Sequence, residues 1–215
     1  MPHRLCEIVE LSSVDPEATG HLKETPLNSR VAYAGGLLKV LRDVVRCPDG
    51  HVTFREFVRH PGAVMIIALL DPDHVVLERQ FRYPLNRAFI EFPAGKLDPG
   101  EDPFICARRE LREETGFQGG EWSHLGGFHN AIGYSDERIE VYLARDLVRK
   151  AGRLDPGEVV EVFQAPWRKL LDWVREGRIT DLKTIVGVHW LERVMSGAWT
   201  AAPLAQPAPA PVEPR

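Results

Sequence analysis

Three glutamates, Glu110, Glu113 and Glu114, stand at a spacing that can bring their carboxylates together. Positions i, i+3 and i+4 share one face of an α-helix, so on a helix these side chains point to one spot. Like charges placed in this way repel each other, and a hard divalent cation with oxygen ligands is the natural counter-charge. The pattern therefore favours a metal site, and a merely solvated helix face is the alternative interpretation.

The neighbouring residues predict that the glutamates lie on a helix that follows a turn-rich loop. Asp102 can cap a helix N-terminus and Gly116 can end the helix, so we expect a helix over residues 102–115. The loop over residues 93–100 is rich in turn formers. Its Gly95 permits a close backbone approach, so that a loop carbonyl can bind the same metal.

The whole segment resembles the Nudix box, G-x5-E-x7-R-E-U-x-E-E-x-G-U, in which U is a bulky apolar residue. The matching residues are Gly95, Glu101, Arg109, Glu110, Leu111, Glu113, Glu114, Gly116 and Phe117. A chance match over such a chain is on the order of one in a million. The resemblance implies a Nudix hydrolase, a fold of the α/β (α+β) class built as an αβα sandwich with a mixed sheet, and bound Mg²⁺.

The resemblance also implies roles for individual residues. Glu110 and Glu114 correspond to direct metal ligands, and the carbonyl of Ala94 to a third. Glu113 corresponds to a metal ligand or a residue that holds water, and Arg109 to the residue that orients the glutamates, so both are expected to be catalytic. The cation is expected to be Mg²⁺, with Mn²⁺ as an alternative, and to neutralise the diphosphate and activate water.

The segments around the box resemble the ADP-ribose pyrophosphatase group. They are residues 78–84 (ERQFRYP), 91–96 (EFPAGK) and 133–137 (GYSDE). The expected reaction is hydrolysis of ADP-ribose to AMP and ribose 5-phosphate. This chain has Ile132 where the group has proline, which leaves GDP-mannose or another sugar nucleotide open as substrate. A non-catalytic nucleotide sensor with a Nudix fold is a further alternative, against which the intact carboxylates argue.

Four residues outside the box are candidates for binding the substrate. Arg59 and Arg82 are the expected cations for the diphosphate, because a guanidinium fork matches phosphate oxygens. Tyr33 is a candidate for stacking on the adenine, with simple packing of its ring as the alternative. Glu137, the last residue of the 133–137 segment, is the fourth candidate.

The general base in this group comes from a mobile acidic loop, and the corresponding segment here covers residues 155–161. We predict that Glu158 is the base, because it precedes a predicted strand and a loop can swing it toward a water molecule. Glu161 is the competing candidate.

Hydrophobic periodicity predicts mixed strands and helices, and the chain divides into three expected regions. Strands are expected over residues 31–34, 37–46, 53–58, 63–70, 75–81, 88–92, 138–144 and 159–163, and further helices over 167–176 and 181–195. Residues 1–60 are expected to form a small antiparallel sheet region, which the resembled group exchanges within a homodimer. Residues 61–200 are expected to form the Nudix domain, and residues 201–215 a disordered Pro/Ala-rich tail.

Composition narrows the possible partners and the compartment. A formal net charge of −4 provides no broad basic field for nucleic acid or an anionic membrane. The longest apolar run, residues 63–70, is far below the roughly 20 residues that cross a bilayer. Three scattered cysteines suit a reducing compartment. We therefore expect a cytoplasmic protein whose partner is a small nucleotide, with neither nucleic acid nor membrane among its partners.

Overall fold

The structure is a computed structural model, and it describes residues 15, 17–152, 154, 157 and 159–204. The chain divides into two compact units, Met1–Arg59 and His60–Arg215. This boundary lies one residue before the one expected from the sequence.

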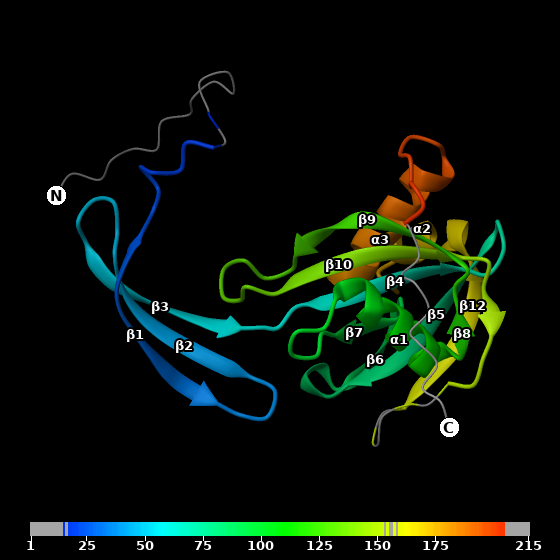
Figure 1. The fold of residues 1–215 in the computed structure, drawn as a ribbon, viewed down its shortest axis with the longest axis horizontal. Coiled ribbons are helices and arrows are strands. Elements are labelled where there is room, and N and C mark those ends of the chain that lie inside the picture. Colours follow the sequence, from blue (N-terminus) through cyan, green and yellow to red (C-terminus); the bar gives the residue numbers. More distant parts are fainter. Residues whose placement is uncertain (1–14, 16, 153, 155–156, 158, 205–215) are drawn as a thin grey trace, which may run out of the picture. The chain divides into compact units, whose positions relative to one another are not determined.

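The first unit contains an antiparallel sheet in the order β1-β2-β3 (Figure 1). Its strands are β1 (Thr25–Ala34), β2 (Lys39–Arg46) and β3 (Val52–Arg59). Between β2 and β3 the chain turns back, and the backbone N–H of Cys47 donates to the carbonyl of His51 over 2.8 Å. β1 begins at Thr25, six residues before the start of the strand expected over residues 31–34. Pairing with β2 satisfies its backbone groups although its polar residues lack a strand pattern.

The second unit contains a seven-stranded mixed sheet in the order β12-β5-β4-β10-β9, with β6 paired to β5 and β7 to β4. Its strands are β4 (Ala63–Leu69), β5 (His74–Arg82), β6 (Arg87–Glu91), β7 (Ala94–Lys96), β9 (Glu121–His129), β10 (Arg138–Arg145) and β12 (Val160–Pro166). The pair of β4 and β10 is parallel and the others are antiparallel. Smaller elements are η2 (Tyr83–Leu85), β8 (Phe117–Gln118) and β11 (Val148–Arg149).

Helices cover both faces of this sheet (Figure 1). They are α1 (Pro103–Thr115), α2 (Trp167–Arg175) and α3 (Leu182–Met195). Side chains of β4 alternate between the two faces: Val64 and Ile66 pack with α1, whereas Met65 and Ile67 pack with α2 and α3. Because β4 is buried on both faces, its sequence is a continuous apolar run. The expected αβα sandwich is confirmed.

The predicted boundaries of α1 are confirmed in detail. The carboxylate of Asp102 accepts hydrogen bonds from the backbone N–H groups of Phe104 (2.9 Å) and Ile105 (3.2 Å). Gly116 has φ +68° and its N–H donates to the carbonyl of Arg112, which ends the helix. Both ends of the glutamate-bearing helix are therefore set by residues next to it in the sequence.

Strand β9 was not predicted, because two glycines interrupt its apolar pattern. Gly126 has φ +123°, and the β10 register shifts between Val141 and Tyr142 opposite it. Residues 201–204, the first part of the segment expected to be a disordered tail, lie against β9. The N–H of Leu204 donates to the carbonyl of Trp122 on this strand over 2.7 Å. The remainder, 205–215, lies outside the described residues.

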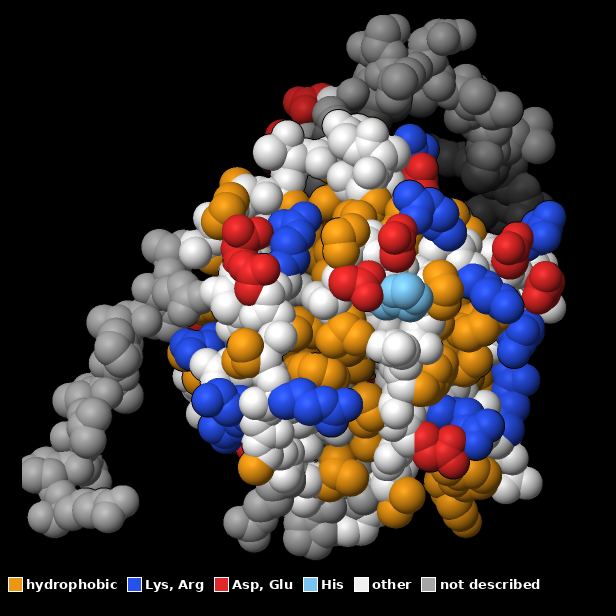
Figure 2. Space-filling view, turned by 90° about the vertical axis from the view of Figure 1, so that its right-hand side faces the viewer, with side chains coloured by type: hydrophobic (Ala, Val, Ile, Leu, Met, Phe, Trp, Pro, Cys, Tyr) orange, Lys and Arg blue, Asp and Glu red, His pale blue; other side chains and the backbone are white. Residues whose placement is uncertain are grey.

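The surface carries no single dominant charge on the face drawn in Figure 2, where acidic, basic and hydrophobic side chains are interspersed. Among the described residues, no helix combines the length and the apolar character needed to span a bilayer.

Candidate active site

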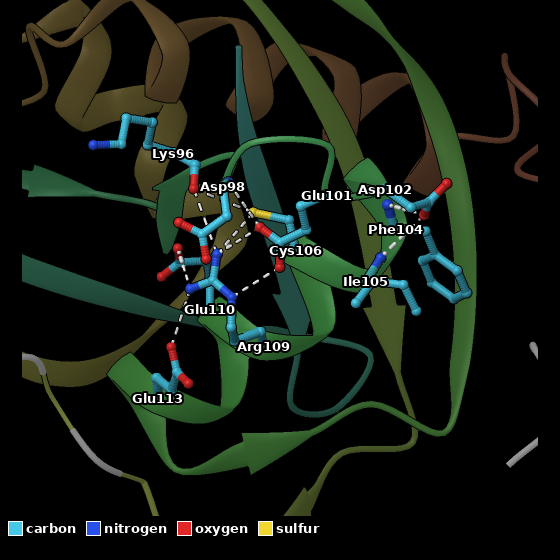
Figure 3. Close-up of polar contacts among 10 residues, drawn as sticks. All are labelled: Lys96, Asp98, Glu101, Asp102, Phe104, Ile105, Cys106, Arg109, Glu110 and Glu113. Carbon is cyan, nitrogen blue, oxygen red and sulfur yellow. Dashed lines mark hydrogen bonds and ion pairs between the residues drawn. The ribbon is translucent and has the colours of Figure 1, made fainter. Parts of the chain in front are cut away.

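Arg109 lies at the centre of the box glutamates (Figure 3). Its Nε and Nη2 donate to the two carboxylate oxygens of Glu101, over 2.9 and 2.8 Å. Its Nη1 donates to Glu110 over 2.8 Å and to Glu113, one helical turn away, over 3.1 Å. One guanidinium therefore holds three carboxylates that would otherwise repel each other.

The loop before α1 packs directly on the Glu110 side chain, and this contact requires a glycine. A Cβ atom built on Gly95 would lie 1.9 Å from Cδ of Glu110, far inside van der Waals contact. Gly95 belongs to β7, which pairs with β4, so the sheet holds the loop against the helix. The first glycine of the motif is thus explained by close approach of the backbone to a carboxylate.

Glu114 joins the helix to the same loop from the opposite end of the cluster. Its Oε2 accepts a hydrogen bond from the backbone N–H of Ala94 over 3.1 Å, and the residue is only 7% exposed. Glu114 and Ala94 therefore meet, as two residues that bind one metal must.

Pairing with Arg109 favours the charged form of Glu101. The hydrogen bonds from Arg109 outweigh burial and lower the pKa of Glu101 from its ordinary 4.5 to about 2. The bond to Glu101 is also the main cause that raises the pKa of the Arg109 guanidinium. Cys106 lies beneath, fully buried, and burial raises the pKa of its thiol, so it packs as an apolar residue rather than acting as a nucleophile.

The donor atoms of this cluster fit a hard divalent cation, because they are carboxylate oxygens next to a backbone carbonyl and carry net negative charge. Within the part of the chain that the structure describes, no three acidic, histidine or cysteine side chains form a preassembled metal cage. Arg109 donates hydrogen bonds to two of the box carboxylates, Glu110 and Glu113.

Tyr33 and Arg59 belong to the first compact unit. Tyr33 is 58% exposed, and its ring covers Gly35 at the end of its own hairpin. The guanidinium carbon of Arg59 lies 5.3 Å from the ring centroid of Phe57. Both side chains are therefore described only within that unit, and their expected roles stay predictions.

Glu137 lies directly before β10 in a small polar cluster of the second unit. Its Oε2 accepts a hydrogen bond from Nδ2 of Asn130 over 2.8 Å, and its Oε1 lies 3.7 Å from Nδ1 of His60. These neighbours hold the side chain in place, and its role in substrate binding stays a prediction.

The two candidates for the general base have different outcomes. Glu158 lies outside the described residues. Glu161 is on β12, where it forms an ion pair with Arg79, its cross-strand neighbour on β5. That pairing competes with a role for Glu161 as a base.

Arg82 forms a two-pronged ion pair with Glu91, a residue to which the sequence assigned no role. Nε and Nη2 of Arg82 donate to the two carboxylate oxygens of Glu91 over 2.8 and 2.7 Å. Glu91 is 1% exposed and also bonds Lys183 of α3. A charged residue at the end of the apolar run 88–92 was the available signal, because a buried charge needs a partner.

The fold and the box together define an enzyme of the Nudix hydrolase class. A model of the NUDIX domain matches residues 59–184. The methanol dehydrogenase activator of Bacillus methanolicus is 38% identical over 172 residues, covering 79% of this chain and 93% of its own. The ADP-ribose pyrophosphatase of Mycobacterium tuberculosis (strain ATCC 25618 / H37Rv) is 36% identical over 191 residues, covering 87% and 89%.

A crystal structure of an ADP compounds hydrolase shares the fold, with a TM-score of 0.75 and 24% identity over 82% of this chain and 96% of that one. This chain belongs to the Nudix family.

Proposed function

We propose that this protein hydrolyses the diphosphate of ADP-ribose to AMP and ribose 5-phosphate. The observation that carries the proposal is the Arg109-centred glutamate cluster beside Ala94, in a chain similar to an ADP-ribose pyrophosphatase. In the reaction, the oxygen of water bonds to one phosphorus and the bridging P–O bond breaks. The released phosphate oxygen and a base take up the protons of the water.

The residues divide the work as follows. Glu110, Glu114 and the Ala94 carbonyl hold Mg²⁺, or Mn²⁺ as the alternative, and Glu113 binds the metal or its water. The cation neutralises the diphosphate and activates water. Arg109 keeps the glutamates oriented.

Substrate contacts come from outside the box. Arg59 and Arg82 neutralise the phosphates, Tyr33 stacks on the adenine and Glu137 contributes a further contact. Glu158 is the proposed base, supported by the pairing of Glu161 with Arg79. We further propose that the protein is a cytoplasmic homodimer.

Two observations favour other candidates. Ile132 replaces the proline of the ADP-ribose pyrophosphatase group, which keeps GDP-mannose in consideration as the substrate. The relative from Bacillus methanolicus is named as an activator of methanol dehydrogenase. An activator role for this chain would be tested by measuring the rate of methanol dehydrogenase with and without this protein. A nucleotide sensor would bind ADP-ribose without releasing product.

The test measures product release from ADP-ribose, GDP-mannose, ADP-glucose and NADH with Mg²⁺, with Mn²⁺ and with a chelator. We expect metal-dependent turnover with preference for ADP-ribose. Glu114→Gln should lower kcat/KM by more than about 100-fold, because the amide loses the charge that binds the cation. Glu192→Gln, a surface carboxylate of α3, is the matched control and should behave as the wild type.

Each contrary outcome points to a particular error. Full activity of Glu114→Gln would overturn the metal assignment. Preference for GDP-mannose would keep the chemistry and replace the substrate. Tight ADP-ribose binding without product, in either metal, would support the sensor.

A further inference from the structure

The guanidinium of Arg82 is held at the second unit's sheet by a chain of charged residues that reaches into α3. Glu91 receives the Arg82 fork, and Nζ of Lys183 binds the same Oε2 of Glu91 that Nη2 of Arg82 binds. Lys183 in turn donates to Oδ2 of Asp181 over 2.9 Å. The chain therefore runs Arg82, Glu91, Lys183, Asp181.

Asp181 anchors this chain to the fold. It is the N-cap of α3, and its Oδ2 accepts hydrogen bonds from the N–H (3.0 Å) and the hydroxyl (2.6 Å) of Thr184. Thr184 is fully buried, and its hydroxyl oxygen accepts a bond from the N–H of Phe92 over 3.3 Å. The start of α3 is thus bonded to the residue that follows Glu91 in the chain.

Burial makes the geometry of this network demanding. The Glu91 carboxylate is almost fully buried, which alone would favour its neutral form, yet the bond from Arg82 and the charge of Lys183 lower its pKa. A buried carboxylate that loses one of its cations reorganises, because uncompensated buried charge is costly. The side chain of Lys183 is 14% exposed, and its ammonium group holds Oε2 of Glu91 in place from α3.

The Arg82 side chain is only partly buried beside Glu91. It is 40% exposed, and the fork to Glu91 uses Nε and Nη2, so Nη1 lies on the edge away from Glu91. Two parallel bonds to one carboxylate require that guanidinium and carboxylate share a plane. The position of Glu91 therefore sets the direction in which Nη1 points.

The register of β5 puts Arg82 on the face that carries the box. Val76 packs with α1, and strands alternate faces, so Glu78 and Arg82 share its side of the sheet. Glu91 is the direct cross-strand neighbour of Glu78 and lies on the same side. The register therefore puts the fork on the Val76 side of the sheet, the side on which α1 packs against β4, while α3 contacts β6 and supplies Lys183.

From these contacts we infer that Lys183 is a positioning residue: by pinning Glu91, it orients Arg82 to bind a phosphate of the diphosphate substrate. The inference rests on the proposed function in that Arg82 binds the diphosphate. Lys183 itself touches neither substrate nor metal. Its loss is expected to weaken substrate binding more than the chemical step.

The experiment compares Lys183→Met, which keeps the length of the side chain and removes its charge, with Lys183→Arg and with Lys169→Met, an exposed lysine of α2. We expect Lys183→Met to raise KM for ADP-ribose about tenfold and leave kcat within about threefold. Lys183→Arg should recover most of the loss, and Lys169→Met should match the wild type. Thermal unfolding measures any loss of folded protein separately.

A double-substitution cycle separates positioning from a merely structural role. In an Arg82→Ala background, where KM is already raised, Lys183→Met should raise KM no further. Wild-type KM in Lys183→Met, or effects of the two substitutions that multiply, would overturn the inference.

A second probe, inorganic pyrophosphate, distinguishes failure of the positioning role from failure of the proposed function. Its binding in the presence of Mg²⁺, measured by calorimetry, should weaken in Arg82→Ala and in Lys183→Met alike. If the wild type does not hydrolyse ADP-ribose, but its pyrophosphate binding weakens in both variants, the proposed substrate is wrong and the positioning role is supported. If pyrophosphate binding is independent of either residue, the positioning role is overturned.

Discussion

Arginine serves two different purposes among the glutamates of this protein. Arg109 bonds three carboxylates that share a helix and its preceding loop. Arg82 bonds a single, buried carboxylate. The first arrangement keeps several negative charges together without metal, and the second presents one positive charge in a defined direction. Substituting lysine in either place would lose the planar fork on which both depend.

The first residue-scale prediction concerns the stability that Glu101 contributes at different pH values. Its folded pKa of about 2 lies below its ordinary 4.5. A carboxyl with a lowered folded pKa stabilises the fold above its unfolded pKa, and this contribution is lost as pH falls through the folded pKa. The metal-free wild type should therefore exceed Glu101→Gln in stability at pH 7, and the difference should shrink between about pH 4.5 and 2.

Urea unfolding of both proteins at several pH values in chelator measures this difference. Because the side chain of Glu101 is 12% exposed, salt should reduce the difference only modestly. A difference that stayed constant down to the lowest accessible pH would contradict the ion pair as its source.

At the scale of elements, α1 is bounded by signals that act over a few residues. Asp102 caps its first turn and Gly116 ends its last. Between them the apolar residues Ala107 and Leu111 pack on β4, which leaves Glu110 and Glu113 facing the loop. The cap at Asp102 therefore helps to fix the helix that carries the glutamates.

Asp102→Ala should destabilise the protein by about 1 kcal/mol, because two backbone N–H groups lose their acceptor. Denaturant unfolding measures this loss. Asp172→Ala is the matched control: this carboxylate forms an exposed pair with Arg175 on α2 and should change stability by less than about 0.5 kcal/mol. Equal losses in the two variants would mean that the cap contributes nothing specific.

At the scale of the whole molecule, the first unit carries apolar side chains on a three-stranded sheet. Val44 and Phe54 are exposed cross-strand neighbours, and Val52 is exposed on the same face of β3. A small sheet with exposed apolar side chains is typical of a surface that a second chain covers. This is consistent with the expected homodimer.

Light scattering during size exclusion should therefore give a mass near twice the 24.2 kDa of one chain. Phe54→Glu should shift this mass toward the monomer, because it buries a charge in the expected interface. Val148→Glu, a comparable exposed position in the second unit, should leave the mass unchanged. A monomeric wild type at micromolar concentration would refute the expected dimer.

The resemblance to the Nudix box implied the αβα class, and the sequence alone predicted the limits of α1 and the carboxylate cluster. These features depend on signals within about 25 residues: caps, a 3.6-residue period and glutamates one turn apart. The box residues Glu101, Arg109, Glu110 and Glu113 meet in the structure for that reason, because a helix and its own preceding loop bring them together.

Only the tertiary structure decided the partners that are distant in the sequence. Glu91 and Lys183 are separated by 92 residues, and their contact depends on the register of β6 against β5 and the docking of α3. Strand β9, with its glycines, likewise owes its place to pairing with β10 rather than to its own pattern. Sequence periodicity reports which face of an element is buried, whereas the partner of a buried charge is chosen by packing between elements.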